Sequence, residues 1–164
     1  MINKKEDYIW GILRICLGLI FLWAFFDKLF GLGFATTADK SWLLGNSPTS
    51  GFLEFGTKGI FAGFYQSLAG SVIVDWLFMV GLLFIGVALT LGIGVKLAGY
   101  SGVLLLLMMY TAGFMPPEHH PFLDEHIIYS IVLIGCAIVG AGRYLGFGNW
   151  WSELDFVRRN KWLE

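Results

Sequence analysis

The sequence predicts an all-α integral membrane protein in which residues 1–164 form a single four-helix bundle. Its composition is the first observation: 57% of the residues are hydrophobic and 14% are charged, whereas soluble domains average about 45–50% apolar and about 25% charged residues. The second is the presence of four mainly apolar segments of about 20 residues, the length that spans a bilayer. The third is the concentration of Lys and Arg on one side of these segments.

The first predicted span covers residues 8–30 and follows two lysines, Lys4 and Lys5. A cleavable signal peptide would begin in the same way, but its apolar core is about 7–15 residues long and ends at a small-residue cleavage site. Here the apolar run continues to Phe30, and no such site follows. We therefore expect a retained helix.

A connection of residues 31–72 follows, which is too long for a turn between neighbouring helices. It contains large apolar side chains, among them Trp42, Phe52 and Phe61, and disordered segments have few of these. We expect a partly helical extracytoplasmic segment that caps the bundle, with short amphipathic helices at the membrane interface.

The other three predicted spans are residues 73–91, 95–114 and 126–145. Glycines at 92 and 94 separate the second span from the third, and Pro116 and Pro117 end the third because proline interrupts helical hydrogen bonding. Such short connections favour antiparallel neighbours. Small residues in the spans are expected at helix–helix contacts: Gly11, Gly18, Gly81, Ala88, Ala98, Gly102, Gly135 and Gly140.

The positive charges predict that both termini are cytoplasmic. With this orientation the inner side holds Lys4, Lys5, Arg14, Lys96, Arg143, Arg158, Arg159 and Lys161, and the outer side holds Lys28, Lys40 and Lys58. An excess of Lys and Arg marks the cytoplasmic side of a membrane protein. We therefore expect a multi-pass protein of the cell membrane, in contact with the lipid bilayer.

Four ionisable residues at the predicted outer ends are candidate catalytic residues, since charges near a membrane are costly. Asp27 and Lys28 close the first span, Asp75 opens the second and His126 opens the fourth. The alternative is that these side chains simply meet outer water. Arg14, inside the first span, is either functional or extends toward the lipid headgroups.

All three histidines lie in one stretch with several acids: Glu118, His119, His120, Asp124, Glu125 and His126. Such a cluster can bind a metal, transfer protons near neutral pH or bind an anion, and a solvated loop can contain the same residues. Because the spacing matches no metal motif, we predict no metal site. The cysteines, Cys16 and Cys136, are either apolar packing residues or a redox pair.

Other motifs are absent from the sequence. It has no phosphate-binding loop, no flavin or dinucleotide fingerprint and no Cys–His zinc or haem motif. It also has no basic run of the kind that binds nucleic acid.

Four stretches carry a family resemblance: LRICLGLIFLWAFFDKLFGLGFA (13–35), SWLLGNSPTSGFL (41–53), VGLLFIGVALTLGIGVKLAGYSG (80–102) and DEHIIYSIVLIGCAIVGAGRYLGFGNW (124–150). They resemble the DoxX family, and more narrowly its DoxD-like branch, the small membrane subunit associated with thiosulfate:quinone oxidoreductase. The resemblance implies oxidation of two thiosulfates to tetrathionate, with membrane quinone accepting the electrons. It also implies a DoxA-like partner subunit, which this chain does not contain.

A quinone site would need an apolar, aromatic slot with a few polar contacts. Trp23, Trp42, Trp76 and Tyr129 are the candidate quinone-binding residues. The alternative function is a non-catalytic anchor or accessory subunit of a larger respiratory or redox complex. The partners expected for this chain are a DoxA-like or other redox subunit, or further copies of itself. The basic tail at residues 156–162 is then a docking segment or an interfacial anchor. A transporter is a weaker alternative, because no span shows a mid-membrane break with an ionisable centre.

Overall fold

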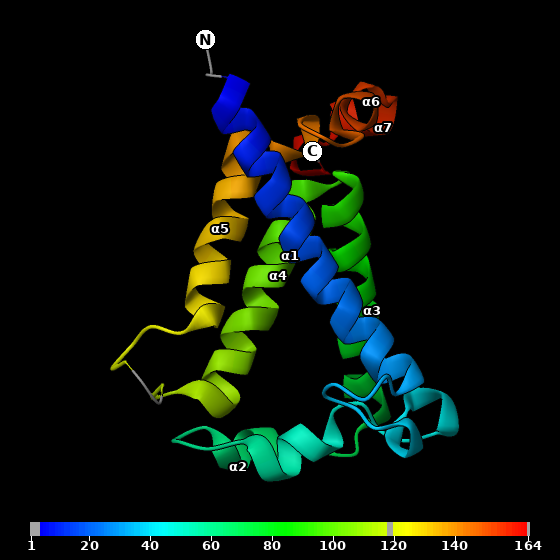
Figure 1. The fold of residues 1–164 in the computed structure, drawn as a ribbon, viewed down its shortest axis with the longest axis vertical. Coiled ribbons are helices and arrows are strands. Elements are labelled where there is room, and N and C mark those ends of the chain that lie inside the picture. Colours follow the sequence, from blue (N-terminus) through cyan, green and yellow to red (C-terminus); the bar gives the residue numbers. More distant parts are fainter. Residues whose placement is uncertain (1–3, 118–119, 164) are drawn as a thin grey trace.

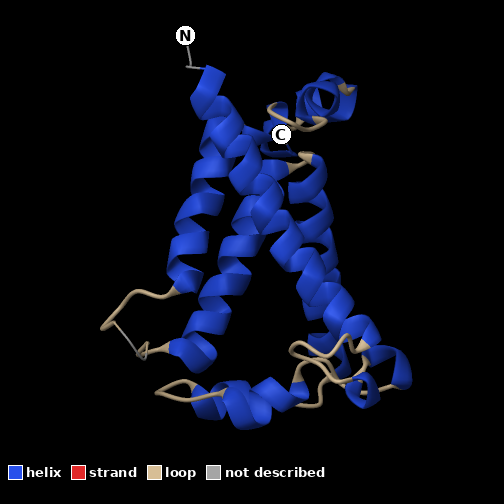
Figure 2. Cartoon of the chain, in the orientation of Figure 1, coloured by secondary structure: helices blue, strands red, loops and turns tan. Residues whose placement is uncertain are grey.

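The computed structural model describes residues 4–117 and 120–163. Over these residues the protein is all-helical, with 74% of it in helices and no strand. The body consists of α1 (Lys4–Phe30), α3 (Val72–Leu91), α4 (Val95–Met109) and α5 (Glu125–Val139). Both termini lie at one end of this body, and the connection between α1 and α3 crosses the opposite end (Figures 1 and 2).

Three helices are long and apolar enough to cross a membrane, over Lys5–Phe30, Val72–Leu91 and Val95–Phe114. They match the first three predicted spans. The third consists of α4 continued by a π-helical turn, Tyr110–Phe114.

The fourth apolar helix, α5, is shorter than predicted. It ends at Val139, because Gly140 adopts a left-handed conformation (φ 65°) and its N–H closes onto the Cys136 carbonyl. A 3₁₀ turn, Ala141–Arg143, follows. The prediction of one helix over 126–145 is therefore wrong at its end, and Arg143 does not continue the helical face of Cys136. The 15 residues of α5 span only about 22 Å.

The helices pack around one apolar core that includes Leu17, Phe21, Met79 and Leu133. Close approach of α1 and α3 depends on glycine, because a Cβ added to Gly86 would lie 2.8 Å from the Leu22 backbone nitrogen. Gly18 is equally crowded by Thr90, whereas a Cβ at Gly81 would meet nothing within 4 Å. Gly18 is therefore at a helix contact as expected, and Gly81 is not.

Large apolar side chains also cover the outside of the body. Ile73 and Ile138 are each 73% exposed, and Leu77 is 70% exposed. Further exposed residues on α1, α3 and α5 are Ile9, Ile12, Leu19, Ile20, Val80, Ile128 and Ile131. An apolar surface of this extent is typical of contact with lipid.

The connection between α1 and α3 is partly helical. It contains 3₁₀ turns at Ala38–Lys40 and Trp42–Leu44, a π-helical turn at Phe52–Gly56, and α2 (Ala62–Gln66). Leu53 and Tyr65 pack against Ala112 in a second apolar cluster. The Tyr65 hydroxyl also lies 2.8 Å from Thr111 Oγ1. The connection is therefore attached to the end of α4, and we call residues 31–71 the cap.

The C-terminal segment folds back onto the other end of the body. It contains α6 (Gly148–Glu153) and α7 (Asp155–Arg159). Val157 is fully buried, and Trp151 Nε1 donates a hydrogen bond to the Leu163 carbonyl at 2.6 Å. The basic tail at residues 156–162 is thus partly packed against the body.

Candidate functional site: a cavity beneath the cap

A cavity of about 760 Å³ lies between the cap and the adjacent ends of α1, α3 and α4. Aromatic and aliphatic side chains supply most of its wall: Phe52, Leu53, Phe55, Leu68, Val74, Phe78, Leu105, Met108, Met109 and Phe114. Its volume falls within the roughly 300–1,000 Å³ of typical small-molecule sites. This is the candidate functional site.

Two lysines add positive charge to the wall. Lys28, in the last turn of α1, is half-buried and places its Nζ 5.8 Å from the centroid of the Phe78 ring. Lys40, from the cap, is exposed at the rim. The cavity therefore combines an apolar interior with cations that can bind an acidic or carbonyl-bearing head group.

A neighbouring aspartate, Asp39, partly offsets the positive charge of Lys40. A hydrogen bond from the Thr37 side chain is the main cause that lowers the pKa of Asp39, and the positive charge of Lys40 lowers it further. Asp39 is therefore ionised beside Lys40 at neutral pH.

Asp75 holds the polar part of the cavity wall in place. It lies in the first turn of α3, is 6% exposed, and accepts hydrogen bonds from Ser47 Oγ at 2.7 Å and Thr49 Oγ1 at 2.5 Å. Ser47 Oγ in turn accepts a bond from the Ser50 N–H at 3.0 Å. Ser47, Thr49 and Ser50 all line the cavity, so Asp75 positions its wall from behind.

Asp27 has a similar structural role at the end of α1. Its carboxylate is 2% exposed and accepts bonds from the N–H groups of Phe34 at 3.1 Å and Ala35 at 3.0 Å. The chain reaches this position by turning at Gly31, which has a φ of 67°. Asp27 therefore fixes the start of the cap, and Ala35 lines the cavity.

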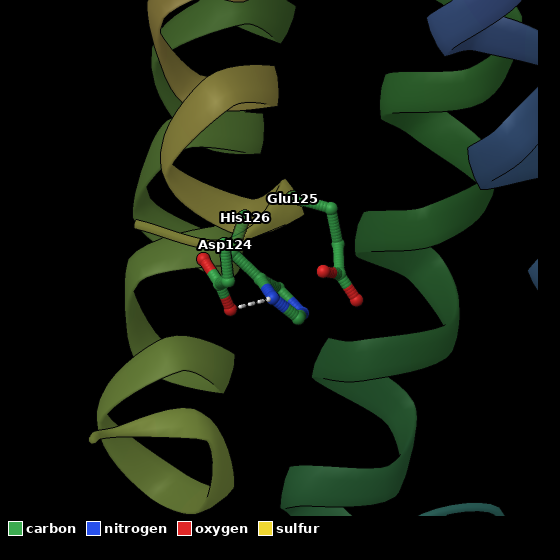
Figure 3. Close-up of side chains that lie close together, drawn as sticks. All are labelled: Asp124, Glu125 and His126. Atoms are coloured by element: carbon green, nitrogen blue, oxygen red, sulfur yellow. Dashed lines mark hydrogen bonds and ion pairs between the residues drawn. The ribbon is translucent and has the colours of Figure 1, made fainter. Parts of the chain in front are cut away.

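His126 lies at the start of α5 and pairs with Asp124. Its Nδ1 is 2.8 Å from Asp124 Oδ2, and Asp124 caps the helix by accepting from the Ile127 N–H. Figure 3 shows these two side chains pointing toward each other, with Glu125 extending from the same turn. The imidazole packs on Phe114 with ring centroids 4.5 Å apart. Since Phe114 lines the cavity, His126 sits behind that wall.

The ligand atoms of Asp124, Glu125 and His126 lie within 4.8 Å of one another, close enough to share a cation. Asp124 is hydrogen-bonded to the imidazole Nδ1 and so orients the ring, which means that a shared cation would be bound through Nε2. Glu125, the third member of the group, is exposed. Of the other predicted cluster members, Glu118 and His119 lie outside the described residues. His120 Nδ1 accepts bonds from the Phe122 and Leu123 N–H groups.

The four candidate quinone-binding residues do not line the cavity. Trp42 and Trp76 pack edge to face with centroids 4.8 Å apart, and Trp23 packs on Phe34 at 4.9 Å. Tyr129 packs against the main core. Residues that the sequence analysis did not single out, including Phe78 and Phe114, form the wall instead. Aromatic content alone could not distinguish them, because lining a cavity depends on how the helix ends diverge.

Arg14 is fully buried at the opposite end of the body, where it donates to backbone carbonyls. Its Nε binds Ala141, its Nη1 binds Leu89 and Thr90, and its Nη2 binds Tyr144 and Leu145. These bonds engage all five guanidinium N–H donors. Arg14 therefore joins the C-terminus of α3 to the turn after α5 and does not extend to headgroups.

The two cysteines form no disulfide in this structure. Both are free: Cys16 is exposed, whereas Cys136 is buried with its Sγ 4.0 Å from the Trp10 carbonyl.

Comparisons with family models, curated proteins and solved structures found no match for this chain.

Proposed function

We propose that this protein binds membrane quinone in the cavity beneath the cap, as the membrane subunit of a thiosulfate:quinone-type oxidoreductase. The observation that carries the proposal is the combination of a largely apolar cavity with the half-buried ammonium of Lys28. A quinone has a flat apolar ring and two carbonyl acceptors, so it requires aromatic walls and a donor. Phe78 supplies such a wall, and Lys28 supplies the donor.

In this proposal the protein crosses the cell membrane four times, with both termini cytoplasmic and the cap outside. The three long apolar helices, the common end of the two termini and the excess of Lys and Arg at that end support this topology. The short α5 is the fourth crossing, and its exposed isoleucines support lipid contact.

The electron donor in this proposal is thiosulfate or a related sulfur anion, as the DoxX resemblance implies. Two thiosulfates form one S–S bond and release two electrons, and quinone takes up these electrons with two protons to give quinol. Lys40 at the outer rim attracts the dianion. The Asp124–His126 pair is the proton-handling group, and a DoxA-like partner subunit completes the complex.

The test compares quinone binding and turnover in matched variants. We expect Lys28→Met to weaken binding of a quinone analogue by about tenfold or more, because hydrogen bonds to charged groups contribute about 1.5–3 kcal/mol. Lys58→Met, on the cap but away from the cavity wall, is the matched control and should bind normally. Unchanged affinity of Lys28→Met for the quinone analogue would exclude the cavity beneath the cap as the quinone site.

Turnover is measured as thiosulfate-dependent quinone reduction by purified protein, alone and with co-purifying partners. We expect activity in at least the partner-containing preparation. If both preparations are inactive while a known thiosulfate:quinone oxidoreductase works in the same assay, the redox assignment fails, even if quinone binds.

A second candidate function is that of a non-catalytic accessory subunit. It is favoured by the hydrogen bonds of Asp27 and Asp75, which are both used to hold the cap. Purification in a mild detergent separates the two functions. A stable hetero-complex whose partner turns over without this chain supports an accessory role, whereas a lone monomer or homodimer counts against it.

A further inference from the structure

A second, smaller cavity of about 150 Å³ lies at the end of the body that carries both termini. It is formed by the start of α4, the last turn of α5 and α6. Its volume is below the roughly 300 Å³ at which pockets begin to enclose a drug-sized molecule. A head group fits such a space, whereas a whole amphiphile does not.

The chemistry of this small cavity favours an anion. Lys96 and Arg143 both line it. None of the described residues that line it is acidic. Lys96 Nζ also donates to the Lys161 carbonyl at 3.2 Å, which holds its ammonium near the C-terminal segment. An ammonium and a guanidinium are typical donors to a phosphate.

The backbone of α4 adds to this positive field. The helix begins at Val95 after Gly94, whose lack of a side chain leaves the first N–H groups without a side-chain cap. The N-terminus of a helix carries a partial positive charge, and the first two residues of α4, Val95 and Lys96, line the cavity.

The surroundings of the cavity indicate that the anion belongs to a lipid. Ile138, which is 73% exposed, and Trp151 line the cavity. Phe147 (59% exposed) and Trp150 (58% exposed) are next in the chain to the lining residues Gly148 and Trp151. Ile138 also continues the exposed face of α5. A basic pocket bordered by tryptophan and by an apolar helix face matches the interface between headgroups and acyl chains.

We propose that this cavity binds the phosphate of an anionic phospholipid, with the acyl chains lying along the outer face of α5. The proposal does not depend on redox chemistry. It rests only on the proposed topology, in which this end of the body faces the cytoplasmic leaflet.

The experiment measures lipid binding without turnover, so its failure is distinguishable from failure of the quinone proposal. The wild-type protein in mild detergent is titrated with phosphatidylglycerol or with phosphatidylcholine of the same acyl chains, and the unfolding midpoint and retained lipids are recorded by thermal denaturation and native mass spectrometry. We expect phosphatidylglycerol, and not phosphatidylcholine, to raise the midpoint and to remain bound.

The Lys96→Gln/Arg143→Gln double variant should bind phosphatidylglycerol about thirtyfold more weakly, since each basic residue near the membrane contributes about fivefold in affinity. Lys40→Gln/Lys58→Gln, which removes two lysines from the cap, is the matched control and should retain the lipid preference. If the double variant unfolds at a lower temperature even without lipid, the single variant Lys96→Arg replaces it in the test. Because it keeps the positive charge, it should bind phosphatidylglycerol as the wild-type protein does.

Three results would overturn the proposal. The first is equal stabilisation by the two lipids, and the second is full phosphatidylglycerol binding by the cavity variant. The third is equal stabilisation by soluble glycerol phosphate, which would reassign the cavity to a water-soluble phosphate ester.

Discussion

Thr49 and Asp75 join the cap to the first turn of α3 through a buried hydrogen bond of 2.5 Å, between residues 26 positions apart. Because Thr49 also lines the large cavity, this bond couples the shape of the cavity to a carboxylate behind its wall. We predict that Thr49→Val and Asp75→Ala are coupled in a double-mutant cycle by about 1.5–3 kcal/mol, the range for hydrogen bonds to charged groups.

The measurement is chemical unfolding in detergent micelles, paired with affinity for a quinone analogue. Ser67→Ala provides the control, because Ser67 Oγ donates to the Phe64 carbonyl on the exposed side of the cap. The effect of Ser67→Ala should add to that of Asp75→Ala. Equal coupling energies in the two cycles would contradict a specific bond between Thr49 and Asp75.

Arg14 should be among the residues on which stability depends most. Arg14→Met removes the donors to five backbone carbonyls, and each unsatisfied buried acceptor costs about 1–3 kcal/mol. We expect a loss of more than about 3 kcal/mol in unfolding free energy. Arg14→Lys should recover part of it, because an ammonium has three donors and no planar fork.

The control for Arg14 is Arg158→Met, at an exposed position of α7. It should change the unfolding free energy by less than about 0.5 kcal/mol, as surface substitutions generally do. An Arg14→Met protein as stable as this control would show that the carbonyl bonds contribute nothing net.

Variants of Asp27 test whether its carboxylate only positions the cap or takes part in the reaction. Asp27→Ala should remove hydrogen-exchange protection from the Phe34 and Ala35 amides, because both donate to this carboxylate. Asp27→Asn keeps one acceptor oxygen and should retain part of the protection. Turnover should fall in proportion to the protection lost. If Asp27→Asn abolishes turnover while both amides stay protected, the carboxylate itself takes part in the reaction.

Gly86 and Gly81 form a matched pair within α3. A Cβ at Gly86 would meet the Leu22 backbone nitrogen at 2.8 Å, whereas a Cβ at Gly81 would meet nothing within 4 Å. We expect Gly86→Ala to lower the thermal midpoint by forcing α1 and α3 apart. Gly81→Ala should leave it unchanged or raise it, because alanine favours a helix by about 0.5–1 kcal/mol over glycine. The opposite order would contradict the close packing of α1 on α3.

The first three predicted spans could be found from the sequence because an apolar run of about 20 residues is a local property. The end of α5 was missed for a local reason as well: Gly140 was interpreted as a packing residue, although a glycine near a helix end is also a typical stop signal. The predicted catalytic residues are only partly at the cavity. Lys28 lines it, Asp75 and Asp27 hold its wall, and His126 lies behind Phe114.

The sequence by itself determined the helical class, the three long apolar helices and a partly helical cap, because these follow from composition and periodicity along the chain. Tertiary structure alone decided the partners of Arg14, which reach Leu145 at a separation of 131 positions. It also decided which aromatic residues line the cavity. Both depend on how closely the helices approach, which Gly18 and Gly86 control through contacts between backbones that no pattern within one segment reveals.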